Sequence, residues 1–111
     1  MAGKTKRHVP QTAGSRMDYP VNTEAVDLQI TIGGRDTGSV VFRYRPYLPG
    51  KPSVERADFE QPADFSISFE TSPQGVKKRT FVLKDTRLSW VEIDDSGNSA
   101  LGDFWVSIVQ Y

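Results

Sequence analysis

The chain has 111 residues, with 14 basic and 14 acidic side chains, so its formal net charge is zero. This length fits a single domain. The absence of cysteine excludes disulfides, thiolate metal sites and cysteine nucleophiles, and a single histidine excludes a multi-histidine metal centre. No apolar run approaches the roughly 20 residues of a membrane helix. The first residues lack the apolar stretch of a signal peptide, so we expect no membrane partner.

The charge is distributed unevenly along the chain. Residues 1–17 carry four basic side chains and no acid, whereas residues 18–111 hold ten basic and fourteen acidic ones, a net charge of −4. Large apolar side chains are nearly absent from the first segment, so it cannot form a core by itself. We predict a basic N-terminal arm over residues 1–20 and a β-sandwich domain over residues 21–111; the alternative is an ordinary disordered terminus.

Residues 25–45 alternate apolar and polar side chains on both sides of a glycine-rich segment. "AVDLQITI" places Val26, Leu28, Ile30 and Ile32 on one side, and "SVVFRYR" alternates in the same way. The intervening "GGRDTG" has the composition of a turn. The pattern predicts a β-hairpin.

Residues 46–63, "PYLPGKPSVERADFEQPA", contain four prolines, which interrupt any β-ladder. The stretch after Pro52 could form one helical turn with Ser53 as its N-cap. Otherwise the segment is a long loop, which is either a binding segment or a plain crossover between two sheets.

The rest of the chain reads as strands separated by turns. Strands are expected at 64–71, 76–85, 86–94 and 101–111, with turns at "SPQG" and "DSGNSA". The last strand carries apolar side chains on both faces, which places it in the middle of a sandwich or against a partner. No window has helical periodicity, so we predict an all-β protein, a small antiparallel sandwich or barrel of about six to seven strands.

The sequence gives little support for catalysis. The only histidine, His8, lies in the basic tail, and there is no phosphate-binding loop or dinucleotide fingerprint. We therefore expect a protein that is not an enzyme and has no cofactor. A partial match to a calcium loop comprises Glu92, Asp94, Ser96 and Asp103. The favoured alternative is a hairpin turn whose polar side chains make local hydrogen bonds.

Two basic clusters could contact nucleic acid. Arg43 and Arg45 share a strand face close to Tyr47, which would suit stacking and phosphate contacts. The second cluster is Lys77, Lys78 and Arg79. Alternatively, both clusters are solvated and pair with the acids of residues 55–70. The net charge of −4 argues against nucleic-acid binding by the folded part, which leaves only the tail for that role.

One segment resembles a known group of proteins. "LQITIGGRDTGSVVFRYRPYLPGKP" followed by "ADFSISF", within residues 28–69, is similar to small β-rich proteins encoded by tailed bacteriophages. Tyr47, Pro49, Gly50 and Pro52 approximate the tyrosine- and proline-rich segment of that group. The resemblance implies a β-rich virion protein, of the kind that decorates a shell or forms a small tail or connector part.

We expect a non-enzymatic virion structural or assembly protein that binds itself or a larger shell protein, in the virion or otherwise in the host cytoplasm. The contacts would come from the arm, the 46–63 loop and the C-terminal strand, because aromatic and basic side chains dominate interfaces. The expected contact residues are Lys4, Lys6, Arg7, Arg16, Tyr47, Leu48, Val54, Phe59, Trp105 and Tyr111. The alternative is a soluble phage-encoded inhibitor or host-takeover protein that uses the acidic residues 55–70 as a nucleic-acid mimic. Tail-mediated nucleic-acid binding ranks third.

Overall fold

A computed structural model of the protein describes residues 5–35, 37–62, 65–69 and 78–111. Within these residues the chain forms eight strands and one short 3₁₀ helix, η1. The elements are β1 Thr5–Gln11, β2 Arg16–Pro20, β3 Leu28–Gly33, β4 Ser39–Pro46, η1 Arg56–Asp58, β5 Ser66–Ser68, β6 Lys78–Leu83, β7 Leu88–Asp94 and β8 Phe104–Gln110.

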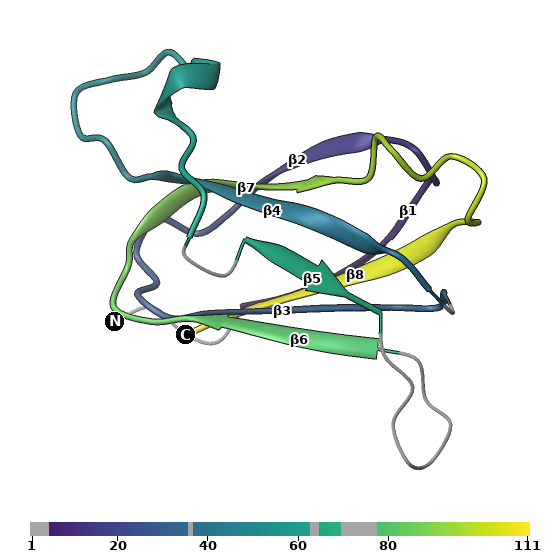
Figure 1. Ribbon diagram of the computed structural model, residues 1–111. Helices are drawn as coiled ribbons and strands as arrows, with labels where there is room; N and C mark the ends of the chain where they lie inside the picture. Colours follow the sequence, from purple (N-terminus) through teal and green to yellow (C-terminus); the bar gives the residue numbers. More distant parts are fainter. Residues whose placement is uncertain (1–4, 36, 63–64, 70–77) are drawn as a thin grey trace.

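The strands form two antiparallel four-stranded sheets that pack face to face (Figure 1). We call them sheet A, with the order β1-β8-β3-β6, and sheet B, with the order β2-β7-β4-β5. Eight strands in this order form a jelly roll, a sandwich of two Greek keys. The predicted all-β sandwich is therefore confirmed, with one or two more strands than expected.

The additional strands come from the N-terminal segment, where the expected arm over residues 1–20 does not hold for residues 5–20. Strand β1 pairs with β8 along its whole length, and β2 pairs with β7. Edge strands are held mainly by backbone hydrogen bonds, so this segment joins the sheets despite its few large apolar side chains. The boundary expected between residues 20 and 21 consequently lies inside the sandwich. Lys4 is outside the described residues.

The hairpin predicted for residues 25–45 is wrong, although both of its strands exist. Strand β3 pairs with β8 and β6 in sheet A, whereas β4 pairs with β7 and β5 in sheet B. The segment between them crosses from one sheet to the other. Alternation of side chains shows which face of a strand is buried but not which strand is its neighbour.

The remaining elements follow the predictions with shorter bounds. The strand expected at 64–71 is β5, with three residues, and those expected at 76–85 and 86–94 are β6 and β7. The last strand, β8, is confirmed as an interior strand between β1 and β3. One helical turn does follow Pro52, as η1, but its N-cap is Glu55 and not Ser53 as predicted. The "SPQG" turn lies outside the described residues. None of the helical structure in the described part of the chain is long or apolar enough to cross a membrane.

The core lies between the two sheets. Sheet A contributes Leu28, Ile30 and Ile32 from β3 and the alternate apolar side chains of β8, while sheet B contributes Phe42 and the buried side chains of β7. Burial of each such side chain stabilises the fold by about 1.5–3 kcal/mol. The loop that joins β4 and β5 projects from the sandwich near the end where β1 begins and β8 ends (Figure 1).

Candidate functional site

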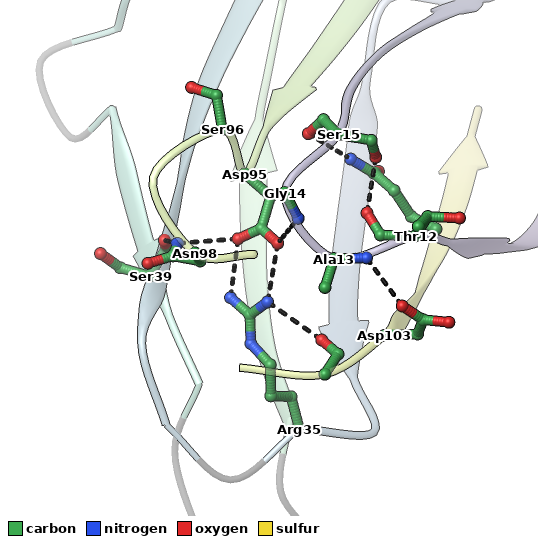
Figure 2. Close-up of polar contacts among 12 residues, drawn as sticks. Thr12, Ala13, Gly14, Ser15, Arg35, Ser39, Asp95, Ser96, Asn98 and Asp103 are labelled. Atoms are coloured by element: carbon green, nitrogen blue, oxygen red, sulfur yellow. Dashed lines mark hydrogen bonds and ion pairs between the residues drawn. The ribbon is translucent and has the colours of Figure 1, made fainter. Parts of the chain in front are cut away.

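A buried ion pair holds the end of the sandwich that lies away from the β4–β5 loop (Figure 2). The two guanidinium nitrogens of Arg35 donate to the two carboxylate oxygens of Asp95, each at 2.8 Å. Both side chains are at most 2 % exposed. The backbone amide of Gly14 and the side-chain amide of Asn98 donate to the same carboxylate, at 3.0 and 2.7 Å.

Arg35 makes further contacts that fix its position. Its guanidinium donates to the carbonyl of Gly102 at 3.3 Å and lies over the rings of Phe69 and Phe104, at 4.5 and 4.9 Å from their centroids. Burial opposes ionisation of Asp95, but hydrogen bonds led by that of Arg35 lower its pKa below the usual value. Among the described residues no buried side-chain polar atom lacks a partner. The polar groups of Arg35 and Asp95 are therefore paired within the protein, and this cluster has a structural role.

A second ion cluster lies on the outer face of sheet B. Glu92 is fully buried there, and Arg43 donates to it at 2.7 Å and to Asp94 at 2.9 Å. Arg56, from the β4–β5 loop, also pairs with Glu92. Burial raises the pKa of Asp18, and the hydrogen bond and the negative charge of the neighbouring Glu92 raise it further. The ion pair between Arg56 and Glu92 thus joins this loop to strand β7.

Two acids of this cluster, Glu92 and Asp94, are held ionised by their partners. Burial alone would raise the pKa of Glu92, but hydrogen bonds from Asp18, Arg43 and Arg56 lower it. Burial likewise opposes ionisation of Asp94, whose hydrogen bonds with Ser96 and Arg43 lower its pKa to about 2. A carboxylate that stays ionised at neutral pH and is already paired is a poor proton donor or acceptor for catalysis.

The β4–β5 loop, residues 47–62, is fastened to sheet B by Arg45. This side chain is only 3 % exposed. It donates to the carbonyl of Ser53 at 2.9 Å, to the hydroxyl of Ser89 at 2.8 Å and to Asp58 at 3.4 Å. Lys51 pairs with Asp58 at 2.5 Å, and this hydrogen bond lowers the pKa of Asp58.

The outer surface of the loop exposes apolar side chains beside charged ones. The guanidinium of Arg87 lies 4.7 Å from the ring centroid of Tyr47. Val54 is 46 % exposed. A shallow groove of about 290 Å³ runs along the loop, lined by Tyr47, Leu48, Pro49, Gly50, Lys51 and Pro52. The fastened loop therefore presents aromatic and aliphatic side chains in a fixed arrangement, which is the kind of surface that anchors a protein interface.

The outer face of sheet A carries the aromatic side chain of the last strand. Trp105 is half-buried, and its ring lies over Gly33. A Cβ atom added at Gly33 would lie 2.3 Å from this ring. The ring centroid of Trp105 is 5.1 Å from that of His8. A pocket of about 420 Å³ at the end of this face is lined by Asp27, Leu28, Gln29, Val82, Lys84 and Tyr111.

The structure does not bring the four calcium candidates together. Glu92 and Asp94 belong to the charged cluster on sheet B. The amide of Ser96 donates to Asp94, and Asp103 accepts from the amide of Ala13 at 2.8 Å. In the part of the chain that the structure describes, no three acidic or histidine side chains gather in a way that could hold a metal ion. The turn interpretation fits these contacts.

The expected nucleic-acid platform is also used internally. Arg43 pairs with acids of β7 and Arg45 fastens the β4–β5 loop, so both guanidinium groups already have partners within the protein. Lys77 lies outside the described residues, as do the side chains of Lys78 and Arg79. In the acidic segment 55–70, Asp58 already forms ion pairs with Lys51 and Arg45.

The expected protein-contact residues are distributed over several places. Arg7 donates to the carbonyl of Pro20 at 3.4 Å and lies 5.4 Å from the ring centroid of Tyr19. Arg16 is 3.9 Å from Glu92, and the guanidinium of Arg56 covers the ring of Phe59. Lys6, Tyr47, Val54 and Tyr111 are exposed, whereas Leu48, Phe59 and Trp105 are half-buried. These residues do not form one continuous site.

Sequence reasoning missed the pair of Arg35 and Asp95. A signal for the acid was present, because the alternation Val91, Ile93, Asp95 continues the buried phase of β7 into the turn. A charged residue in the buried phase needs a partner of opposite charge. Arg35, within "GGRDTG", was the candidate, but only the crossing of that segment between the sheets brings it near.

The architecture and these contacts define the protein as a jelly-roll β-sandwich whose buried charges are paired. No protein-family model matches the sequence, and no curated protein matches it. Among solved structures, a chain of the Bacillus endospore appendages, described as a novel family of disulfide-linked pili, has a similar course of the backbone. It is 16 % identical, has a TM-score of 0.47, and the match covers 97 % of this chain and 86 % of that one. This degree of likeness assigns no function, and the present chain has no cysteine with which to form disulfides.

Proposed function

We propose that this protein is a non-enzymatic structural component that assembles with copies of itself or with a larger protein. One observation carries the proposal: in the described part of the chain, the charged side chains that cluster together are paired with one another, while several apolar side chains are exposed. The pairs are Arg35 with Asp95, Arg43 with Glu92 and Asp94, and Arg45 with Asp58. The exposed apolar side chains include Tyr47, Val54, Val82 and Tyr111.

The setting that we propose is a virion, where the protein would bind a larger shell protein; otherwise it would act in the host cytoplasm. The similarity of residues 28–69 to tailed-phage proteins supports this setting. Viral capsid proteins often have jelly-roll folds, but lectins and cupins have them too, so the fold alone does not choose among them. The fastened β4–β5 loop, which includes the matching tyrosine and prolines, is the expected contact.

The test is quantitative mass spectrometry of purified virus particles from the organism that encodes the protein. We expect a fixed number of copies per shell subunit that persists through repeated purification. A variant with Tyr47→Ser and Val54→Ser should bind to particles at a reduced level, whereas the matched variant Leu101→Ser, which changes an exposed leucine close to Gly38 at the other end of the sandwich, should bind normally. Absence from the particles would contradict the virion setting.

A further inference from the structure

Strand β1 contributes little to the core although it is paired along its full length. No apolar side chain of β1 is fully buried, whereas β3 buries Leu28, Ile30 and Ile32. Only Val9 packs partly against the core. The backbone ladder with β8, from Thr5 opposite Gln110 to Gln11 opposite Phe104, is therefore the main attachment of this strand.

Before its last residue, the side chains of β1 add the ring contact of His8 with Trp105 and few other specific attachments. Lys6 and Arg7 form no ion pair with another residue that the structure describes. Pro10 has no backbone N–H and so donates nothing to the ladder. The contacts of Arg7 with Pro20 and Tyr19 lie at the long end of such interactions.

The last residue of β1 and the turn that follows it are, in contrast, firmly anchored. Gln11 donates to the carbonyl of Ile93 at 3.0 Å and accepts from the hydroxyl of Tyr19 at 2.9 Å. The amides of Ala13 and Gly14 donate to Asp103 and Asp95, at 2.8 and 3.0 Å (Figure 2). A lightly held strand thus extends from a fixed hinge.

From this contrast we propose that β1 is exchanged between copies, so that residues 5–10 of one copy pair with β8 of another. This inference rests on the proposed self-assembly and names its contact. A β8 that has lost residues 5–10 of its own β1 presents an open strand edge six residues long, and an open edge pairs readily with a strand of another chain. The incoming β1 has the same sequence as the one that left, so all the original contacts are restored and only the hinge changes.

The geometry allows either closed or open assemblies. Six extended residues reach about 20 Å from the hinge. Mutual exchange between two copies gives a closed dimer, and one-way exchange gives a chain of copies. Both use the same partner surface, the edge of β8, and the same ligand, the β1 strand of a second copy.

A disulfide between β1 and β8 tests the exchange, because the natural chain has no cysteine. His8 is opposite Ser107 on the outer face of sheet A, within the spacing that a disulfide spans. The variant with His8→Cys and Ser107→Cys is oxidised after assembly, and its oligomer and monomer fractions are run on a denaturing non-reducing gel. The matched control has Thr31→Cys and Thr80→Cys, which join β3 to β6 within one copy.

The expected result is covalent dimers or longer ladders from the oligomer fraction of the His8/Ser107 variant, and only monomers from the control. Each single substitution should also give only monomers. If the oligomer fraction gives only internally bridged monomers, the exchange is refuted while self-assembly stands. If no oligomer fraction forms at any concentration, self-assembly and the exchange both fail. The pair Lys6→Cys and Val109→Cys serves if the first variant does not fold.

Discussion

Arg35 and Asp95 join segments that are far apart in the sequence. Together they contact the turn after β1, the crossing between β3 and β4, and the segment between β7 and β8 (Figure 2). Removal of one partner from a buried pair leaves the other charge without compensation, and this destabilises a protein far more than loss of an exposed pair. The geometry of the pair therefore sets the stability of this end of the sandwich.

Asp95→Asn should lower the free energy of unfolding by about 3–5 kcal/mol, because the shape is kept while Arg35 loses its counter-charge. Chemical denaturation followed by tryptophan fluorescence measures this change. Asp103→Asn is the control, since that carboxylate is exposed and accepts from one backbone amide, and it should change the same quantity by about 1 kcal/mol or less. Equal effects of the two substitutions would contradict a special role for the buried pair.

Gly33 and Trp105 illustrate a steric requirement on the outer face of sheet A. Gly33→Ala should destabilise the fold by about 1–3 kcal/mol, because the added methyl group would meet the indole ring. Trp105→Val in the same chain should remove most of the additional penalty. Gly97→Ala is the control, as its Cβ would meet no atom within 4 Å. Additive effects of the two changes in a double-mutant cycle would show that the two residues do not interact.

The strand elements were largely predictable from the sequence, but their partners were not. Alternation identified the buried faces of β3, β4 and β8 correctly, since a period of two follows from strand geometry alone. The placement of β3 and β4 in different sheets depends on their pairings with β8 and β7, which come much later in the chain. Arg45 was expected at the surface for the same reason, because the local alternation of β4 does not show that the following loop covers this side chain.

The β4–β5 loop should become a better protease substrate when Arg45 is replaced. Arg45→Met removes the hydrogen bonds to Ser53 and Asp58, so trypsin should cleave after Arg56 several-fold faster under native conditions. Lys6→Met is the control, because Lys6 is exposed on β1, which belongs to the other sheet. An unchanged rate of cleavage would mean that the loop is held by other contacts.

For the whole molecule, acid sensitivity follows from the paired carboxylates. The pKa values of Asp58, Glu92, Asp94 and Asp95 are lowered in the fold, that of Asp94 to about 2. A lowered pKa contributes stability that is present above the unfolded value of about 4 and is lost as the pH falls through the folded value. Asp18, whose pKa is raised, acts in the opposite direction.

We therefore expect the melting temperature to be nearly constant around neutral pH and to fall between about pH 4 and pH 2. Differential scanning fluorimetry across this range measures the effect. Asp94→Asn should make the decline shallower, whereas Asp27→Asn, a change outside both ion clusters, should leave its slope unchanged. A melting temperature that rises as the pH falls below 4 would contradict the assigned ion pairs.

The state of association tests the central claim of self-assembly, on which the exchange of β1 between copies rests. Sedimentation velocity of the purified full chain, from low to high micromolar concentration, measures it directly. The account predicts dimers or longer assemblies whose share rises with concentration. A single species with the mass of one 12.4 kDa chain at every concentration would contradict it.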